Sequence, residues 1–266
     1  MSLFQEQLIV RVKQKCRDDN RLVAALTYGS FTKGEGDQYS DIEFWLFFES
    51  LDGLDTEAWI SEISPVHYIT VNEFDTHVAF FKEHLIRGEF HLKAASEMET
   101  VRLWPAIGPP ASDQMVIVDK TGKLHAYIGE GKPSAAHSVD AIERLCGQYL
   151  NWLLFGFNVL KRGDLAQAHM ILGKVQGYLL WMVRLKEEST NHWLTQSKSL
   201  EREISRDAYQ NYVECTARCE NEDLVRAYRH SWIWGSRLIT DLERKHGFSI
   251  PTVLLEAIAG YVHFAR

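Results

Sequence analysis

Two carboxylates stand two positions apart at the start of an apolar run, Asp41 and Glu43 in the stretch SDIEFWLFF. Because side chains alternate across a β-strand, these acids would point to one face while Ile42 and Phe44 point to the other. Carboxylates this close repel each other unless a cation lies between them. Hard oxygen ligands without a neighbouring histidine or thiolate favour Mg²⁺ or Mn²⁺, and Mg²⁺ typically binds one or two carboxylates together with phosphate oxygens. The pattern therefore predicts a magnesium site that acts on a nucleoside triphosphate.

A glycine-rich loop, GSFTKGEGDQYS at residues 29–40, comes directly before the two acids. Glycines let the backbone approach an anion closely, and consecutive N–H groups in such a turn bind phosphate. The loop lacks the GKS or GKT ending of a Walker P-loop and leads into a strand, which argues against ordinary kinases and ATPases. A surface hairpin with two solvated acids is the alternative interpretation. The expected nucleotide-binding residues are Gly29, Ser30, Lys33 and Ser40.

Runs rich in β-branched and aromatic residues fill the first half of the chain and predict the strands that would position these groups. The expected strands are residues 22–28, 42–48, 66–71, 77–81, 89–93 and 115–118, after an amphipathic helix over residues 3–15. Such elements predict a mixed β-sheet flanked by helices. Three prolines, Pro105, Pro109 and Pro110, indicate a rigid loop before the last strand.

The pattern changes near residue 135, where apolar residues begin to recur at helical spacing. The stretch GEGKPSAAHS, residues 129–138, has the composition of a linker. Long helices are expected over residues 139–160, 164–188, 205–218, 222–246 and 250–264. We therefore expect an α+β protein of two domains, with the mixed sheet and the chemistry in residues 1–134 and a helical bundle in residues 135–266.

The composition is that of an ordinary globular protein, with 266 residues, 45% of them hydrophobic and 24% charged. A formal net charge of -7 argues against a nucleic-acid partner, since binding to phosphate backbones requires a basic surface. The N-terminus lacks the features of a signal peptide, and no run approaches the roughly 20 apolar residues of a membrane span. We therefore expect a cytoplasmic protein with no membrane partner. The four cysteines are scattered along the chain, which favours reduced thiols over disulfides. For Cys215 and Cys219 we expect buried thiols, with a shared metal as the alternative.

A Gly-Ser pair followed about a dozen residues later by a strand-borne D-x-E resembles the signature of the nucleotidyltransferase fold of DNA polymerase β and its relatives. More narrowly, YGSFTKGEGDQYSDIEF at 28–44, LIRGEFH at 85–91 and NVLKRG at 158–163 resemble the bacterial lincosamide nucleotidyltransferases. Members of this family transfer an adenylyl group from ATP to a hydroxyl of lincomycin or clindamycin, which inactivates the antibiotic. The resemblance implies a lincosamide acceptor, ATP as co-substrate and one or two Mg²⁺ ions. The residues alone predict metal-dependent nucleotidyl transfer to an unidentified hydroxyl.

Transfer of this type also needs a group that accepts the proton of the acceptor hydroxyl, and the fold usually supplies a third carboxylate from a neighbouring strand. Our candidate is Glu89 in RGEFHL, where the resembling family also carries an acid; a solvated strand-edge glutamate is the alternative. Arg87 could pair with phosphate, and His91 is expected to be structural or substrate-lining. The reserve acids are Glu83, Glu73 and Asp119. The expected catalytic and metal-binding set is Asp41, Glu43 and Glu89.

The helical half carries more large aromatic residues than a small bundle needs for its own core, which suggests a shared surface such as a drug pocket or a dimer interface. Antibiotic-modifying relatives of the fold are often dimers, so the resemblance implies a homodimer. An aminoglycoside acceptor, a nucleotidyltransferase-like antitoxin that binds a partner and an inactive nucleotide sensor are the alternatives. The aromatic residues are Trp152, Phe155, Phe157, Tyr178, Trp181, Trp193, Trp232 and Trp234.

Overall fold

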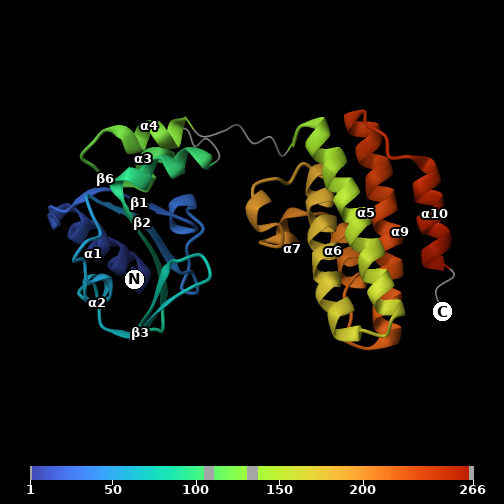
Figure 1. Cartoon of the computed structure of the whole chain (residues 1–266), viewed down its shortest axis with the longest axis horizontal. Coiled ribbons are helices and arrows are strands. Elements are labelled where there is room, and N and C mark those ends of the chain that lie inside the picture. The colour runs from blue at the N-terminus through green and yellow to red at the C-terminus, as the bar shows by residue number, and fades with distance from the viewer. Residues whose placement is uncertain (1, 105–110, 131–136, 264–266) are drawn as a thin grey trace. The chain divides into compact units, whose positions relative to one another are not determined.

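The computed structural model describes residues 2–104, 111–130 and 137–263. The chain divides into two compact units, Met1–Ser134 and Ala135–Arg266. The first unit contains a β-sheet with helices, and the second is helical (Figure 1). These features confirm the expected α+β class, with a mixed sheet flanked by helices followed by a helical bundle. Within the described residues, no helix is both long and apolar enough to cross a membrane.

Six strands form one mixed sheet in the order β3-β4-β5-β2-β1-β6. The strands are β1 (Leu22–Tyr28), β2 (Ile42–Phe48), β3 (Val66–Val71), β4 (His77–Phe81), β5 (Arg87–Ala94) and β6 (Val116–Asp119). β2 and β5 pair in parallel, whereas the other neighbours pair antiparallel. The strands that carry the predicted chemistry, β1, β2 and β5, are therefore direct neighbours in the middle of the sheet.

Helices cover both faces of this sheet (Figure 1). The helical segments of the first unit are α1 (Phe4–Asp18), η1 (Phe31–Lys33), α2 (Thr56–Ser61), η2 (Ala95–Leu103), α3 (Ala111–Met115) and α4 (Lys123–Gly129). α1 and α2 contribute to the larger apolar core, whereas η2, α3 and α4 form a smaller core on the other face. Only α1 was expected from the sequence, because the other segments are too short to show a helical period.

Alternation along β2 decides what each face of the sheet carries. Phe44 and Leu46 point into the larger core, and Phe47 joins the smaller core. Glu43 and Trp45 are only partly buried, on the face opposite Phe44. The sheet therefore presents polar and aromatic side chains at the end where β2 begins, while Ile42, Phe44 and Phe90 pack into the larger core.

The second unit packs its helices around one apolar core. Its elements are α5 (Val139–Lys161), α6 (Leu165–Lys186), η4 (Trp193–Thr195), α7 (Leu200–Glu203), α8 (Arg206–Glu214), α9 (Asn221–His246) and α10 (Thr252–His263). The hydroxyl of Ser138 caps α5 by accepting a hydrogen bond from the Ala141 N–H at 3.3 Å. Gly247 follows the last residue of α9, and its φ of 77° is the left-handed conformation that glycine favours after a helix.

A buried arginine holds together the segment between α6 and α8. The side chain of Arg184 is 0% exposed and donates to Glu203 at 2.6 Å. It also donates to the carbonyl oxygens of Gln196 at 2.7 Å and Lys198 at 2.6 Å. Glu203 in turn lies 2.6 Å from Nδ1 of His192. The path of this connection therefore depends on one guanidinium and its carboxylate partner.

Most expected boundaries agree closely with the structure, and β1 to β4 have the expected bounds. α8 ends at Glu214, so Cys215 and Cys219 do not lie on one helical turn. Cys215 is buried but Cys219 is exposed, so the expectation of buried thiols is wrong for Cys219. The predicted proline loop at 105–110 and residues 131–136 of the predicted linker lie outside the described residues.

The aromatic residues of the helical unit mostly join its core. Phe157 and Trp234 are buried, and Trp152, Tyr178, Trp193 and Trp232 pack against the core from partly buried positions. Two residues are exceptions: Phe155, whose side chain is 42% exposed, and Trp181, which is partly buried and donates its indole N–H to the Trp193 carbonyl at 2.9 Å. Packing within the bundle therefore occupies most of the aromatic surface that the sequence made conspicuous.

Candidate active site

Glu43 and Glu89 are paired in register across the parallel strands β2 and β5. Paired residues on adjacent strands lie about 5 Å apart and point to the same face. Their neighbours Phe44 and Phe90 are also paired and stack in the larger core, with ring centroids 5.4 Å apart. The sheet thus brings two of the three predicted acids side by side, with apolar packing behind them.

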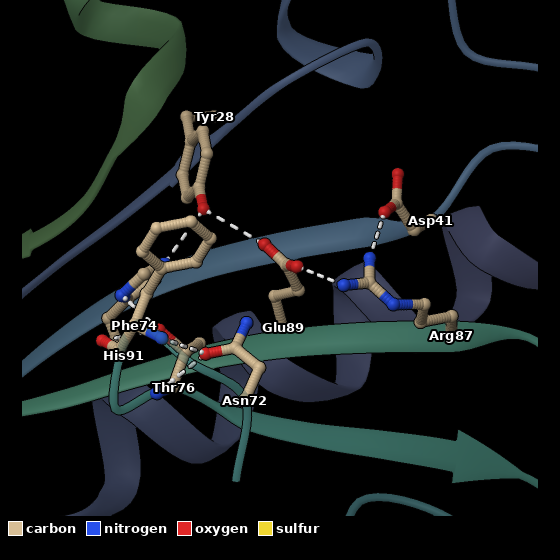
Figure 2. Close-up of polar contacts among 8 residues, drawn as sticks. All are labelled: Tyr28, Asp41, Asn72, Phe74, Thr76, Arg87, Glu89 and His91. Carbon is tan, nitrogen blue, oxygen red and sulfur yellow. Dashed lines mark hydrogen bonds and ion pairs between the residues drawn. The ribbon is translucent and has the colours of Figure 1, made fainter. Parts of the chain in front are cut away.

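Asp41 lies one residue before β2 and is linked to Glu89 through Arg87. The guanidinium donates to Oδ2 of Asp41 at 2.6 Å and to Oε1 of Glu89 (Figure 2). Partial burial acts to lower the pKa of Arg87, but the hydrogen bonds and charges of Glu89 and Asp41 outweigh it and raise this pKa above its usual value. Arg87 is therefore a permanent cation between two of the predicted metal ligands.

Glu43 lies against the turn that follows β1. Gly29 has a φ of +81°, and a Cβ built on it would overlap the Glu43 carboxylate. Glycine is therefore required at this position for two reasons, the left-handed backbone conformation and the space that the carboxylate occupies. The predicted phosphate-binding turn and the second acid are consequently in direct contact.

The other predicted nucleotide-binding residues differ in their surroundings. The hydroxyl oxygen of Ser30 is covered and has no hydrogen-bond partner within the described part of the chain, which is uncommon for a buried hydroxyl. Lys33 is exposed at the end of η1. The hydroxyl of Ser40 donates to Asp37 at 3.0 Å, so it takes part in folding its own loop. Of the three, Ser30 therefore has a hydroxyl that no described residue engages.

A hydrogen-bonded chain that was not predicted from the sequence leads away from Glu89. The Tyr28 hydroxyl lies 3.4 Å from Oε2 of Glu89 and 2.9 Å from Nε2 of His91. Nδ1 of His91 lies 2.9 Å from the Thr76 hydroxyl, and the Thr76 N–H donates to Asn72 Oδ1 at 3.1 Å (Figure 2). These residues come from three separate strands or turns, and the only local signal was the alternation of His91 with Glu89.

Tyr28 and His91 are neutral at neutral pH. Burial lowers the pKa of His91, and this outweighs the opposing effect of the Glu89 charge. Burial and the charges of Glu43 and Glu89 raise the pKa of Tyr28 above its usual value. The chain can therefore orient the Glu89 carboxylate through a phenol hydroxyl without adding charge to the acidic set.

Aromatic rings line the sheet beside this chain. Trp45 stacks on His91 with centroids 4.4 Å apart and 12° between the ring planes. Trp104 meets Tyr28 and Trp45 edge-on at 5.7 and 5.5 Å. Because these four residues are only partly buried, they present an aromatic surface on the face that also carries Glu43 and Glu89. We call these four residues the aromatic group.

The reserve acids lie elsewhere or are exposed. Asp119 is paired with Ala24, near the start of β1, whereas the Tyr28–Glu43 pair lies at the other end of that strand. Its carboxylate accepts hydrogen bonds from Thr121 and His125. Glu73 and Glu83 are exposed in the connections before and after β4. Among the predicted candidates, Glu89 is therefore the acid that lies in register with Glu43.

Within the described residues, no group of three or more His, Cys, Asp or Glu side chains is arranged to hold a metal ion. Asp41 and Glu89 instead share Arg87, and Glu43 lies against Gly29. The donor types nevertheless fit Mg²⁺, because they are hard carboxylate oxygens beside a glycine turn and an unpartnered hydroxyl. Carboxylates and a hydroxyl of this kind are the groups that a divalent cation and a phosphate chain need, and Glu89 is of the residue type that accepts protons.

Residues 138–261 match the family model of the lincosamide nucleotidyltransferase-like C-terminal domain. This match supports the predicted resemblance in the helical half of the chain, outside the sheet that carries the acids. It also confirms the prediction of a nucleotidyltransferase enzyme. A search of curated proteins found no match in sequence.

Two solved structures are similar to the chain. An aminoglycoside 6-adenyltransferase from Bacillus subtilis aligns with 11% identity and a TM-score of 0.46, covering 97% of this chain and 96% of that one. A nucleotidyltransferase-like protein from Exiguobacterium sibiricum aligns with 11% identity and a TM-score of 0.40, covering 91% of this chain and 77% of that one. At these TM-scores we draw nothing from either likeness about the activity or the acceptor.

Proposed function

We propose that this nucleotidyltransferase transfers AMP from ATP to a hydroxyl of a lincosamide antibiotic, with Mg²⁺ bound by Asp41, Glu43 and Glu89. The observation that carries the proposal is the register of Glu43 and Glu89 on adjacent parallel strands, next to the Gly29 turn. Asp41 extends the acidic set through their shared partner Arg87. The family match of residues 138–261 supports the lincosamide as acceptor.

The proposed reaction forms one bond and breaks one bond at the α-phosphorus of ATP. The Gly29 turn and the Ser30 hydroxyl bind the phosphates, which fixes the nucleotide against the acids. Glu89 accepts the proton of the acceptor hydroxyl as its oxygen attacks the α-phosphorus. The bond from this phosphorus to the bridging oxygen breaks, and pyrophosphate leaves. A bound Mg²⁺ supplies charge neutralisation on the reacting phosphate.

Tyr28 has a supporting role in this proposal. Its hydroxyl reaches Glu89 and is held by His91 on the other side. A hydrogen bond from a neutral phenol orients the Glu89 carboxylate toward the acceptor and leaves its second oxygen for the proton. Tyr28 is therefore a positioning residue, and its replacement by phenylalanine should lower the turnover number more than the affinity for ATP.

The surroundings of Glu89 favour a partly apolar acceptor over a polycationic one. The aromatic group lies on the same face as Glu89 and presents ring surface instead of further carboxylates. Polycationic aminoglycosides bind best where several acids face the ligand, whereas aromatic rings suit the apolar parts of a lincosamide. An aminoglycoside acceptor is kept as the second arm of the test.

The remaining expectations go with this proposal. We propose catalysis for residues 1–134, and acceptor binding or dimerisation for residues 135–266. We also propose a cytoplasmic homodimer, which sedimentation at micromolar concentration tests directly, since a single monomeric species would contradict it.

The test is incubation of the purified protein with ATP, Mg²⁺ and lincomycin, clindamycin or kanamycin, followed by mass spectrometry of the drug. The expected result is a gain of one AMP on the two lincosamides that disappears when the metal is chelated. Adduct on kanamycin alone would transfer the proposal to an aminoglycoside acceptor. No adduct on any drug would reject a drug acceptor, and copurification of a protein partner would then favour the antitoxin alternative.

A further inference from the structure

Arg87 lies between two of the proposed metal ligands. Arg87 lies on β5, two residues before Glu89. Its guanidinium donates hydrogen bonds to one oxygen of Asp41 and one oxygen of Glu89. The side chain of Glu89 is 17% exposed and that of Arg87 is 40% exposed, so the pair is partly shielded from water but reachable. Two of the three proposed ligands therefore already share one cation that belongs to the chain itself.

This arrangement has a direct consequence for the binding of a cation. A guanidinium does not release its proton at any ordinary pH, so it cannot yield its charge to make room for Mg²⁺. Two cations that share carboxylate oxygens at about 4 Å repel each other by an amount that changes affinity at least severalfold. A divalent ion can therefore bind the same oxygens of Asp41 and Glu89 only if Arg87 moves away from them.

The released guanidinium has an obvious new partner. Its donors form a planar fork that matches phosphate oxygens as well as carboxylate oxygens. The side chain of Arg87 is partly exposed and has several rotatable bonds, so its guanidinium can move without any change in β5. A nucleotide that arrives with its metal brings both the cation that displaces Arg87 and the phosphates that bind it.

We propose that Arg87 is an exchangeable counter-ion: it holds Asp41 and Glu89 together in the nucleotide-free protein and transfers its hydrogen bonds to the triphosphate when the metal-nucleotide complex binds. This inference rests on the proposed function, because it needs the acids to bind a metal. It predicts that the free protein binds divalent cations weakly until nucleotide is present. Arg87 then has a role both without and with nucleotide: its partners are Asp41 and Glu89 in the first state and the triphosphate in the second.

The decisive measurement is Mn²⁺ binding without nucleotide, by electron paramagnetic resonance, for the wild type and for Arg87→Gln. Removing the competing charge should tighten Mn²⁺ binding about tenfold. In the presence of a non-hydrolysable ATP analogue, the same variant should bind the nucleotide about tenfold more weakly, because the phosphates lose a charged donor. Arg87→Lys keeps the charge and should leave the affinity for Mn²⁺ alone within about threefold of the wild type.

Arg102 offers a matched control in the same unit. Its side chain is also 40% exposed and also contacts two carboxylates, Glu99 at 2.6 Å and Glu130 at 3.1 Å. Arg102→Gln therefore removes the same charge from a similar setting away from the proposed ligands, and both affinities should stay within about twofold of the wild type. An equal gain in Mn²⁺ affinity for both variants would show a general charge effect and overturn the exchange.

Failure of the exchange can be separated from failure of the proposed function with Asp41→Asn. If Asp41→Asn weakens Mn²⁺ binding and Arg87→Gln does not strengthen it, the metal site stands and the exchange is wrong. If Asp41→Asn has no effect on Mn²⁺ binding, both the metal site and the exchange are wrong. Should Arg87→Gln fail to fold, the Nε–H nuclear magnetic resonance signal of Arg87 in the wild type decides: it should shift when Mg²⁺ and the ATP analogue are added, and an unchanged signal overturns the proposal.

Discussion

Two arginines, Arg87 and Arg184, bind carboxylates in opposite surroundings. Arg184 is fully enclosed, with one carboxylate and several carbonyl oxygens as its partners. Arg87 is partly exposed, with two carboxylates that belong to the proposed metal site. A guanidinium that is sealed among carbonyl groups cannot leave without unfolding its surroundings, whereas one at an accessible acidic edge can exchange partners. The comparison separates a charge that maintains structure from a charge that serves binding.

The largest effect on stability is expected at Arg184. Arg184→Met leaves Glu203 without its cation and several carbonyl oxygens without a donor, which should lower the free energy of unfolding by about 3–5 kcal/mol. Arg87→Met should lower it by no more than about 1 kcal/mol, because that pair is partly exposed. Urea denaturation of both variants measures the difference, and equal losses would remove the distinction between the two arginines.

The largest effect on activity is expected at Asp41. Asp41→Asn removes one charge from the metal-binding set, so AMP transfer should fall by about 10²- to 10³-fold. The thermal unfolding midpoint should stay close to that of the wild type, because Asp41 lies outside both apolar cores. The exposed Asp52 provides the control, and Asp52→Asn should keep full activity. Full activity of Asp41→Asn would contradict the proposed site.

A smaller effect is expected at Gly29, where backbone and space can be tested separately. Gly29→Ala should lower the free energy of unfolding by about 1–2 kcal/mol, because alanine is strained at positive φ. The new methyl group also meets the Glu43 carboxylate, so AMP transfer should fall at least about tenfold. Gly53 has a φ of +69° with nothing within 4 Å of the added atom. Gly53→Ala should therefore carry the same strain but keep its activity, and a loss in both would point to strain alone.

The smallest effect concerns the pH dependence of the Arg184 cluster. Burial acts to raise the pKa of Glu203, but hydrogen bonds from Arg184 and His192 outweigh it and lower this pKa below its usual value. Such a carboxyl contributes stability above its unfolded pKa of about 4.3, and the contribution is lost as the pH falls through the folded value. Glu203→Gln should lower the free energy of unfolding at pH 7, because it leaves the buried Arg184 without its carboxylate, and about 1 kcal/mol of this loss should disappear below pH ~4. A constant difference across this range would contradict the assignment.

The sequence predicted the elements far better than the contacts between them. β1 to β4 could be bounded because each is a β-branched or aromatic run flanked by turn residues, whereas α2 and α4 are too short to show a period. Glu89 could be chosen by its alternation with Phe90. The register of Glu89 with Glu43 could not be predicted, because it depends on the pairing of two strands that are distant in the chain.

Contacts made by polar residues were the hardest to foresee. Arg87 was expected to pair with phosphate, yet in the structure its partners are Asp41 and Glu89. Arg184 stands in the apolar run LLWMVRL, and a lone charge in such a run was the available signal that it is buried and paired. The chain from Glu89 through Tyr28 and His91 joins segments that no local pattern connects.

The parallel pairing of β2 with β5 also determines when the acidic set can form. During synthesis, residues 41–43 leave the ribosome well before β5. β2 and β5 can pair only after the residues of β3 and β4, which lie between them in the chain, have been synthesised. Closing such a long loop is slow compared with forming a hairpin. A nascent chain that ends before residue 87 has β2 with an unpaired edge, where other strands can add. Ribosome-bound chains of increasing length should therefore become resistant to aggregation at the point where β5 emerges.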